Sequence, residues 1–402
     1  MKYDFAVIGA NGIQGKIVTR DLLENGYSVL MCAIEDVGLE RLLEYEKSEY
    51  VQLDLKKIEK TRKILKKSKC SVVVNCAIDD FNLDVTQACL ELGINYIDLG
   101  SWEEMTLEQL KLHSQYKAKG IIGITGIGST PGINNIMLRY IKPQFDTIHT
   151  VHLGFSWSSN MPIFVTPFSL DTISREFTTQ ARIFENGKFV DRWPDECKIS
   201  YNYRSIGKQK TYYTPHIEHL TFYEYLKDVG VKNIMVCSSF PEHSRQALET
   251  LIALGLTKKE SIEIEGQEII PLTVIEEYLR RQPIPKGYTE KEDIWLKVYG
   301  KKNGKNKLVE MDAVVGTLPG WEDATCNVDT GMPASILAQM IFKGQIPEYG
   351  MFAPEFVIPP EPFFAELGKR KIWVYENGKK INGNGGLSLL KLAETEKAEV
   401  KS

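Results

Sequence analysis

The sequence lacks a paired-cysteine motif. Its seven cysteines are odd in number, scattered along the chain, and never spaced as C-x-x-C. This pattern predicts a protein of a reducing compartment that holds no structural metal ion. No apolar stretch approaches the length needed to cross a bilayer, and no signal-like region precedes the first strand pattern. We therefore expect a cytoplasmic protein with no membrane partner.

An excess of positive charge is also missing. The formal net charge is −4 and the pI is about 6.0, so the chain carries no electrostatic footprint for nucleic acid. The lysine-rich stretch 56–69 is expected to be the solvated face of one helix. The 402 residues, 43% hydrophobic and 25% charged, are ordinary for a globular enzyme of two domains or one large α/β body.

The most informative feature that is present is a glycine-rich turn near the N-terminus. A short apolar run ends at residue 8, and an amphipathic helix pattern follows the segment Gly9-Ala10-Asn11-Gly12-Ile13-Gln14-Gly15. Such glycines permit a sharp turn, close approach of a pyrophosphate, and tight packing of helix on strand. The helix N-terminus then favours the anion. The spacing is G-x-x-G-x-x-G rather than the commoner G-x-G-x-x-G, and we predict that all seven residues contact a dinucleotide cofactor.

Two acidic residues follow the next apolar run. The run 28–33 is followed by Glu35 and Asp36, about 20 positions after the last glycine of the turn. A carboxylate at this place holds the ribose 2′-OH of NAD and repels the additional phosphate of NADP. NAD is therefore the predicted cofactor, with NADP as the alternative. The competing interpretation of Glu35 and Asp36 is a solvated turn.

Short apolar runs continue to alternate with helical patterns in the first third of the chain. Helices are expected near 57–67, 82–92 and 104–118, with Gly93 and Gly120 as C-terminal caps, and further strands at 50–53, 71–75, 95–99 and 121–125. This alternation predicts an α/β fold with a Rossmann-type doubly wound parallel sheet. Ligands bind beyond the carboxyl ends of such strands. The loops after residues 8, 33, 75, 99 and 125 should therefore converge on one cleft.

The pattern changes after residue 142. Half-buried strands of alternating polarity are expected at 148–156, 231–238, 294–298 and 307–315, with hairpin turns at Asn186-Gly187 and Asn303-Gly304. They predict a second, α+β domain with a mixed or antiparallel sheet. The expected division is a dinucleotide-binding domain over 1–142, a substrate and dimerisation domain over 143–325, helices returning to the first domain over 326–370, and a C-terminal tail over 371–402.

The loop after residue 125 is the second informative segment, and it reads Thr125-Gly126-Ile127-Gly128-Ser129-Thr130-Pro131-Gly132-Ile133-Asn134-Asn135. Thr130 is predicted to be a helix N-cap and Pro131 the first helical residue, so that the positive helix end faces the cleft. Such an end suits a carboxylate or a cofactor phosphate; a capped helix without a ligand is the alternative. We predict substrate contacts at Thr130 and Asn134, and cofactor contacts at Gly128, Pro131 and Gly132.

Four segments taken together resemble the saccharopine dehydrogenase family. They are the glycine turn, residues 72–77, residues 96–100 and the Pro-Gly loop 128–135. The similarity continues through Phe168-Ser169-Leu170, the small-residue helix pattern 330–340, and the segment 344–355 to about residue 370. Within the family the chain looks most like the lysine 6-dehydrogenase branch.

The resemblance implies an NAD(P)-dependent oxidoreductase that acts on the C–N bond of an amino acid, most of all by oxidative deamination of the terminal amine of lysine. The alternative is a saccharopine- or carboxynorspermidine-type dehydrogenase that acts on a secondary amine. Those enzymes usually carry Asp directly before the Pro-Gly pair, where this chain has Thr130, and the difference favours another substrate. A non-catalytic, dinucleotide-binding redox sensor also stays open, because fold alone does not establish turnover.

Amine oxidation needs a base that keeps the substrate nitrogen unprotonated. We predict that Asp98, at the end of a core strand, orients the amine or the nicotinamide; a helix cap is its alternative role. His216, in the polar segment 212–219, is the predicted acid–base catalyst, because histidine titrates near neutral pH. His219 is a predicted substrate contact. The two histidines lie three positions apart without a third clustered ligand, so no metal site is expected.

The remaining predictions concern the substrate carboxylate, the cofactor and assembly. Arg204 and Arg245 are predicted to bind the carboxylate, with exposed surface charge as the alternative for each. Further cofactor contacts are predicted at Asp54, Asn75, Cys76 and Ala77, which follow strand patterns of the first domain. A homodimer is expected, because the long second sheet would otherwise expose an apolar face.

Overall fold

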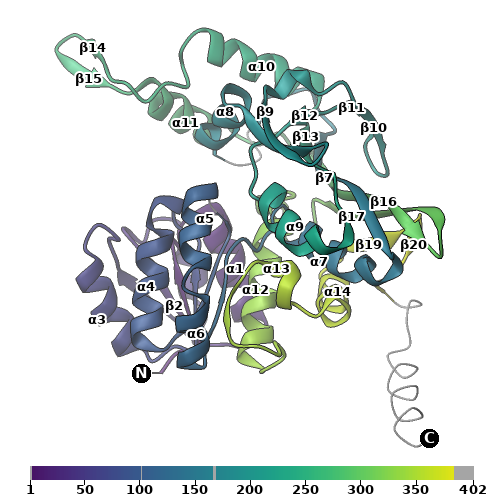
Figure 1. Ribbon diagram of the computed structural model, residues 1–402. Helices are drawn as coiled ribbons and strands as arrows, with labels where there is room; N and C mark the ends of the chain where they lie inside the picture. The colour runs from purple at the N-terminus through teal and green to yellow at the C-terminus, as the bar shows by residue number, and fades with distance from the viewer. Residues whose placement is uncertain (1, 101, 166–168, 384–402) are drawn as a thin grey trace, which may run out of the picture.

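The computed structural model describes residues 2–100, 102–165 and 169–383. The first domain is built on a seven-stranded sheet, parallel throughout, which confirms the predicted doubly wound fold (Figure 1). Its central strands are continuously apolar because helices cover both faces. In spatial order the strands are β3 (Ser48–Gln52), β2 (Val29–Ala33), β1 (Phe5–Ile8), β4 (Val72–Asn75), β5 (Asn95–Asp98), β6 (Ile122–Ile124) and β18 (Gly350–Phe352).

The helices of this domain follow the predicted alternation with one difference. The segment expected as one helix over 104–118 forms two, α5 and α6. Gly93 and Gly120 end their helices in the left-handed conformation, as predicted. The helices are α1 (Ile13–Glu24), α2 (Glu40–Leu43), α3 (Ile58–Ser68), α4 (Asn82–Leu92), α5 (Glu103–Leu110), α6 (His113–Lys119) and α7 (Ile133–Ile141).

The C-terminal part of the chain returns to the first domain and adds the strand β18 to its sheet. The returning helices are α12 (Val328–Phe342), α13 (Pro354–Val357) and α14 (Pro360–Lys369). α12 lies so close to α1 that a Cβ at Gly331 would come within 2.5 Å of the Ile17 side chain. The buried carboxylate of Asp21 on α1 accepts hydrogen bonds from Ser335 and pairs with Arg370 at 2.8 Å. These contacts join α1, near the start of the chain, to the returning C-terminal helices.

The second domain carries a nine-stranded mixed sheet. Its strands are, in spatial order, β20 (Lys379–Lys380), β19 (Trp373–Glu376), β17 (Lys305–Gly316), β16 (Glu290–Lys302), β7 (Thr147–Ser159), β13 (Asn233–Ser239), β8 (Ala181–Glu185) and β9 (Lys188–Arg192), with β12 (Tyr212–Tyr213) beside β13. The run at 231–238 does form a strand, but β13 pairs in parallel with β7. The predicted turns Asn186-Gly187 and Asn303-Gly304 do close hairpins, and all four residues have positive φ.

The second domain also contains the helices α8 (Leu170–Thr178), α9 (Glu218–Leu226), α10 (Glu242–Ala253) and α11 (Pro271–Arg281), and the hairpin strands β10 (Ser200–Tyr203), β11 (Gly207–Lys210), β14 (Ile262–Ile264) and β15 (Gln267–Ile269). The β14–β15 hairpin projects from the body (Figure 1). Short 3-10 turns are η1 (Asp79–Phe81), η2 (Lys142–Gln144), η3 (Pro194–Glu196), η4 (Lys227–Val229) and η5 (Glu322–Ala324).

The predicted tail over 371–402 needs correction. Its first part forms β19 and β20, because β19 pairs with β17 along the edge of the second sheet. Residues 384–402 of the predicted tail, and Phe168 of the resembling segment, lie outside the described residues. Among the described residues no helix is long and apolar enough to cross a membrane.

The two domains share one hydrophobic core, which runs from Phe5 in β1 to Val374 in β19. α7 packs against the second sheet, where the side-chain amide of Asn134 donates to the carbonyls of Gly154 and Trp295 at 3.2 and 3.0 Å. α9 of the second domain lies over α7 and α13 (Figure 1). The carboxyl ends of the first sheet therefore face the second domain.

Candidate active site

The glycine turn between β1 and α1 is built for a phosphate. Gly9 has φ +73°, and a Cβ there would lie 2.8 Å from the backbone nitrogen of Ala77. A Cβ at Gly15 would lie 2.1 Å from the carbonyl oxygen of Gly9. Gly12 caps α1 without a side-chain hydrogen bond, and the first helical turn holds no acidic residue. The positive helix end is therefore open to an anion such as a dinucleotide pyrophosphate.

The other residues of this turn have distinct surroundings. Ala10 is buried, Asn11 is half-buried and Ile13 is exposed. Because the Ala10 side chain is buried, a cofactor would contact this residue through its backbone. The Gln14 side chain donates to the Oδ1 atom of Asn327 at 3.0 Å, while its own buried oxygen finds no hydrogen-bond partner among the described residues. Gln14 thus ties the turn to the start of α12.

Glu35 and Asp36 lie exposed just beyond the carboxyl end of β2. In such a sheet this is the place of the adenosine ribose. The Lys16 ammonium reaches the same loop, because it lies 2.5 Å from where a Cβ of Gly38 would be. Asp54 is placed differently: its Oδ1 atom accepts the backbone N–H of Lys56 at 3.0 Å, which shapes the turn before α3.

The segment at the end of β4 presents backbone rather than side chains. The buried Asn75 donates to Asn82 at 2.8 Å and accepts the N–H of Ala77 at 3.3 Å. Burial raises the pKa of the Cys76 thiol, so this sulfur stays protonated. Any cofactor contact made by Asn75, Cys76 and Ala77 is therefore made chiefly through their main chain, beside Gly9.

Asp98 does not face the cleft, and the catalytic role predicted for it needs correction. Its side chain is fully buried. The two oxygens accept hydrogen bonds at 2.7–3.2 Å from the Tyr96 hydroxyl, the Gln109 amide, the Thr125 hydroxyl and the backbone N–H groups of Gly100 and Gly126. Burial raises the pKa of Asp98, and these donors oppose that rise. Asp98 instead joins the ends of β5 and β6.

The Pro-Gly loop differs from its prediction. α7 begins at Ile133 with Gly132 as its N-cap, so neither the capping role predicted for Thr130 nor the first helical position predicted for Pro131 is right. The reason is that Gly132 adopts φ +135° and folds onto Gly128, where a Cβ would lie 2.2 Å from the Gly128 oxygen. The Thr130 hydroxyl donates to the Oδ1 atom of Asn134, whose amide group is occupied by the second sheet.

The two predicted carboxylate-binding arginines lie away from this loop. Arg204 pairs with Asp312 at 3.0 Å and stacks on Tyr375, on the face of the second sheet that points away from the first domain. Arg245, on α10, is hydrogen-bonded to Glu242 and Glu249. Neither guanidinium is brought to His216.

The structure brings His216 together with acidic residues that sequence analysis did not single out. Its Nε2 atom lies 3.5 Å from Glu176 and its Nδ1 atom 3.7 Å from Glu218. A third carboxylate, Glu355, accepts a hydrogen bond from Asn135 at 2.8 Å. We call Glu176, His216, Glu218, His219 and Glu355 the His216 cluster.

Buried polar atoms without partners distinguish the His216 cluster. Glu218 and Glu355 are fully buried, and Glu176 is 4% exposed. Within the described part of the chain, both Glu218 oxygens and one oxygen each of Glu176 and Glu355 lack hydrogen-bond donors. Unpaired buried carboxylates are costly unless a cation or donor completes them. The cluster is therefore suited to bind a cation.

The titration of the cluster follows from these contacts. Burial opposes protonation of His216, but the carboxylates of Glu218 and Glu176 outweigh it and raise the pKa of His216 to about 10. Burial raises the pKa of Glu355 to about 7, against the hydrogen bond from Asn135. Burial lowers the pKa of His219, whose ring nitrogen lies 3.4 Å from Glu103. The cluster thus holds groups that exchange protons near neutral pH.

One cation near the cluster was also missed. Arg175, on α8 beside Glu176, lies over the ring of Trp102 at 4.8 Å and pairs with Asp171 at 3.1 Å. Its Nε atom is buried without a hydrogen-bond partner among the described residues. Sequence patterns alone do not distinguish such a residue from the solvated face of an amphipathic helix. Sequence analysis did include Glu355, as the last residue of the segment 344–355 that resembles the saccharopine dehydrogenase family.

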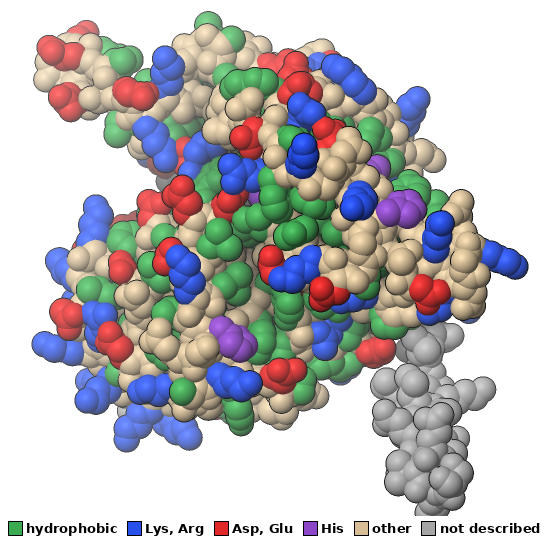
Figure 2. Space-filling view, in the orientation of Figure 1, with side chains coloured by type: hydrophobic (Ala, Val, Ile, Leu, Met, Phe, Trp, Pro, Cys, Tyr) green, Lys and Arg blue, Asp and Glu red, His purple; other side chains and the backbone are tan. Residues whose placement is uncertain are grey.

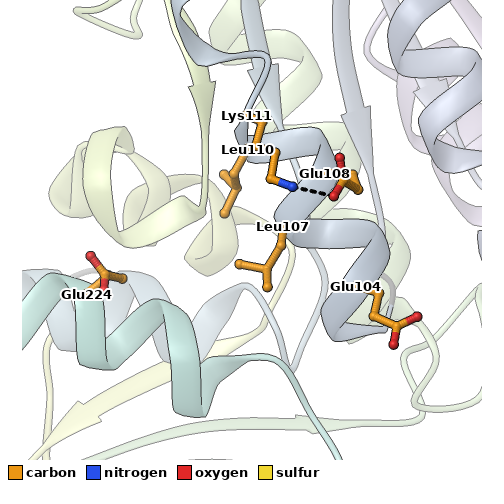
Figure 3. A pocket seen from close by; sticks show the side chains of 6 residues that line it. All are labelled: Glu104, Leu107, Glu108, Leu110, Lys111 and Glu224. Carbon is orange, nitrogen blue, oxygen red and sulfur yellow. Dashed lines mark hydrogen bonds and ion pairs between the residues drawn. The ribbon is translucent and has the colours of Figure 1, made fainter.

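A surface hollow near the cluster is less suited to be the site. It lies between α5 and α9 and is lined by Glu104, Leu107, Glu108, Leu110, Lys111 and Glu224 (Figure 3). Glu108 already pairs with Lys111, and the three carboxylates are exposed.

Figure 2 shows acidic side chains along the edge of the first domain that faces the second. Among the described residues no group of three His, Cys, Asp or Glu side chains is placed to hold a metal ion.

The parallel sheet and the open glycine turn define a dinucleotide-binding α/β oxidoreductase. The chain belongs to the saccharopine dehydrogenase family. Residues 5–124 match the saccharopine dehydrogenase NADP binding domain, and residues 128–372 match the saccharopine dehydrogenase C-terminal domain. The first domain is accordingly an NAD(P)-binding domain, and the family prediction is confirmed.

Two curated relatives align over most of the chain. Carboxyaminopropylagmatine dehydrogenase of Synechocystis sp. is 26% identical over 388 residues, which cover 90% of this chain and 94% of the relative. Carboxynorspermidine synthase of Vibrio alginolyticus is 23% identical over 321 residues, which cover 76% of this chain and 77% of the relative.

Two solved structures share the fold over nearly the full length. Saccharopine dehydrogenase (L-Glu forming) of Saccharomyces cerevisiae has a TM-score of 0.73 at 12% identity and covers 93% of this chain and 99% of its own. Homospermidine synthase of Legionella pneumophila in complex with NAD has a TM-score of 0.67 at 12% identity, covering 96% and 94%.

Proposed function

We propose that the protein is an NAD(P)-dependent oxidoreductase that makes or breaks the C–N bond of a secondary amine carrying a carboxylate. The observation that carries this proposal is the His216 cluster beside the Pro-Gly loop, where three buried carboxylates surround one histidine cation and several of their oxygens lack hydrogen-bond donors among the described residues. Both curated relatives are named for carboxylated polyamine or agmatine derivatives. They support the secondary-amine alternative better than lysine 6-dehydrogenase.

The chain's own residues account for the handling of the amine. When bound, the nicotinamide accepts or supplies a hydride at the carbon next to the nitrogen. A secondary ammonium would be drawn to Glu218 and Glu355, whose free oxygens are buried. It must lose a proton before its carbon gives up hydride, and Glu355, with a pKa of about 7, is suited to take that proton. His216, held as a cation between Glu176 and Glu218, orients the Glu218 carboxylate.

The substrate carboxylate is assigned to Arg175 rather than to Arg204 or Arg245. Arg175 adjoins Glu176 on α8, and its buried Nε atom has no hydrogen-bond partner among the described residues, although its guanidinium also pairs with Asp171. Arginine binds carboxylates in a planar, two-point geometry. Trp102 beneath the guanidinium fixes its plane.

For the cofactor we propose NAD over NADP. Glu35 and Asp36 lie exposed at the end of β2, where a carboxylate favours the free ribose hydroxyl. The homospermidine synthase that shares this fold was solved with NAD. Lys16 at the same loop, and the match of residues 5–124 to a domain described as NADP binding, favour the additional phosphate of NADP.

The test is the formation of NADH and NADPH by purified protein at alkaline pH with carboxynorspermidine, carboxyaminopropylagmatine, saccharopine, ornithine and lysine. We expect turnover of a secondary amine. In the Glu218→Gln variant this activity should fall by at least about 100-fold. Glu224→Gln is the matched control, because Glu224 is an exposed residue of the same helix that pairs with Lys227.

Each other outcome contradicts the proposal in a distinct way. Turnover of free lysine, with none of the secondary amines, would favour lysine 6-dehydrogenase activity instead. Full activity of Glu218→Gln would remove the His216 cluster from catalysis. NADH binding without turnover of any substrate would favour the redox sensor.

A further inference from the structure

The two domains also touch at the start of α5, apart from the hydrophobic core that they share. Trp102 and Glu103 stand there, shortly after the carboxyl end of β5, where the first domain faces the second (Figure 1). Arg175 of α8 lies over the Trp102 ring at 4.8 Å. We call the contact of Trp102 and Glu103 with side chains of the second domain the α5 contact.

Glu103 makes the polar half of the α5 contact. One of its carboxylate oxygens pairs with the Arg182 guanidinium of β8 at 2.9 Å, and the other lies 3.4 Å from the Nε2 atom of His219 on α9. The side chains of Glu103 and Arg182 are 30% and 45% exposed. Ion pairs and cation–π contacts that water can reach stabilise only weakly. The α5 contact is therefore weak enough to open while the shared core holds the domains together.

The hydrogen on the His219 ring is placed by its other nitrogen. Nδ1 lies 2.5 Å from the carbonyl oxygen of His216, and a carbonyl oxygen only accepts, so Nδ1 carries the hydrogen. In the neutral ring Nε2 is then unprotonated. This buried nitrogen has no hydrogen-bond partner among the described residues, although a Glu103 oxygen faces it. Two acceptors oppose each other until Nε2 gains a proton and can donate to Glu103.

The groups around His219 decide when that proton is bound. Burial lowers the pKa of His219, and the backbone carbonyl that it contacts and the carboxylates of Glu103 and Glu218 oppose this effect. Arg182 from β8 pairs with Glu103, and the Phe189 ring of β9, with its centroid 6.0 Å away, is uncharged. Glu218 is on the same helix as His219, so Glu103 is the carboxylate that the first domain supplies.

Contact between the domains and protonation of His219 therefore favour each other. Glu103 raises the pKa of His219 only when the domains touch, and by linkage a proton on His219 strengthens the contact by the same factor. The α5 contact is stronger below the pKa of His219, which lies under the ordinary value of 6.5, and weaker above it.

We propose that the α5 contact is a latch that closes the second domain over the bound dinucleotide, and that His219 is the switch that tightens the latch when it is protonated. The latch lies at the right edge of the sheet for this role, because β5 ends beside β4, and the end of β4 packs on Gly9 of the glycine turn. It governs the exchange of the cofactor rather than hydride transfer. The proposal requires the NAD(P)-binding domain but no particular substrate.

The test measures how fast the reduced cofactor leaves the full-length protein. The protein is saturated with whichever of NADH and NADPH binds more tightly and is mixed with an excess of the oxidised form in a stopped-flow fluorimeter, at about pH 5.5 and about pH 8. The dissociation rate constant of the wild-type protein is expected to be about 5-fold smaller at the lower pH.

Three variants separate the latch from its switch. Glu103→Gln should release the cofactor at both pH values at least as fast as the wild-type protein does at the higher pH, because no carboxylate remains for the imidazolium. Arg182→Gln should speed release at both pH values and keep the ratio between them, because Arg182 does not titrate in this range. Glu104→Gln, at an exposed neighbour in the same helical turn, is the matched control and should behave like the wild-type protein.

Each part of the proposal has an outcome that overturns it. A wild-type rate that does not change with pH, or a pH ratio that survives in Glu103→Gln, would overturn the switch at His219. Wild-type release rates at both pH values in Glu103→Gln and in Arg182→Gln would overturn the latch. None of the three replaced side chains is buried, so each variant is expected to melt close to the wild-type protein, and the rates do not depend on damaged folding.

Discussion

Asn135 donates to Glu355 across 2.8 Å, and this bond joins the Pro-Gly loop to a carboxylate 220 positions later in the chain. The Oδ1 atom of the same amide accepts the N–H of Gly132 at 2.8 Å. One amide side chain therefore fixes both the entry to α7 and a fully buried acid of the His216 cluster. Two variants, Glu355→Gln and His216→Gln, test the chemistry that this geometry creates.

Glu355→Gln is expected to make stability less sensitive to pH. The pKa of Glu355 is raised in the folded protein to about 7 from 4.5. Its stabilising contribution is thus complete below pH 4.5 and is lost as the pH rises through 7. The variant should be more stable than the wild-type protein above pH 7 by roughly 1–3 kcal/mol, measured by urea unfolding at pH 5.5 and 8.5. If the exposed control variant Glu348→Gln showed the same change in the free energy of unfolding, the raised pKa assigned to Glu355 would be contradicted.

His216→Gln should lose stability most clearly at neutral pH. The pKa of His216 is raised to about 10 from 6.5, so its charge stabilises the fold fully below pH 6.5 and ceases to do so as the pH passes 10. Removing the imidazolium leaves Glu176 and Glu218 buried and uncompensated. We expect a loss of about 3 kcal/mol at pH 7 and a smaller loss at pH 10, by urea unfolding. A pH-independent loss would show that packing, not charge, is what His216 contributes.

Gly12→Ala is expected to weaken cofactor binding without disturbing the fold. Gly12 has φ −74°, which alanine adopts, and the new Cβ would meet only the Gly9 carbonyl at 3.3 Å. The methyl group would nevertheless stand at the open end of α1. The dissociation constant of NADH, measured by fluorescence, should rise about 10-fold. Gly316→Ala in β17 is the control, since its φ is not in the left-handed region and the new Cβ would meet the Glu290 carbonyl at an ordinary 3.4 Å.

Glu35→Ala combined with Asp36→Ala should shift cofactor preference toward NADP. Removing both carboxylates ends the repulsion of a 2′-phosphate, while Lys16 stays beside the loop. We expect the ratio of kcat/KM for NADP over NAD to rise by roughly 10-fold, which corresponds to about 1.4 kcal/mol. An unchanged ratio would mean that the two residues are only a solvated turn.

A homodimer stays a prediction. The long second sheet motivated it, and large apolar side chains are also exposed on the projecting β14–β15 hairpin, Ile262 at 49% and Ile264 at 47%. Light scattering at micromolar concentration should give twice the mass of the 45.6 kDa chain. A monomer at that concentration would contradict the prediction.

Local patterns were sufficient for much of the first domain. The glycine turn, the apolar strands and the glycine caps are set by neighbours in sequence, and the helix and strand positions followed to within a few residues. The same holds for the two Asn-Gly hairpins, because residues with positive φ determine the turn. The Pro-Gly loop was mispredicted because Gly132 folds onto Gly128, a contact that a capping pattern does not contain.

By itself, the sequence determined a dinucleotide-binding parallel sheet and membership in the saccharopine dehydrogenase family, because both depend on short contiguous motifs. Only the tertiary structure decided which polar residues meet. Asp98 lies buried in a hydrogen-bond network, and Arg204 and Arg245 lie away from His216. The carboxylates of the His216 cluster come together from distant segments. Burial and the absence of a partner are properties of packing between distant segments, and they are what turns an ordinary glutamate into a binding group.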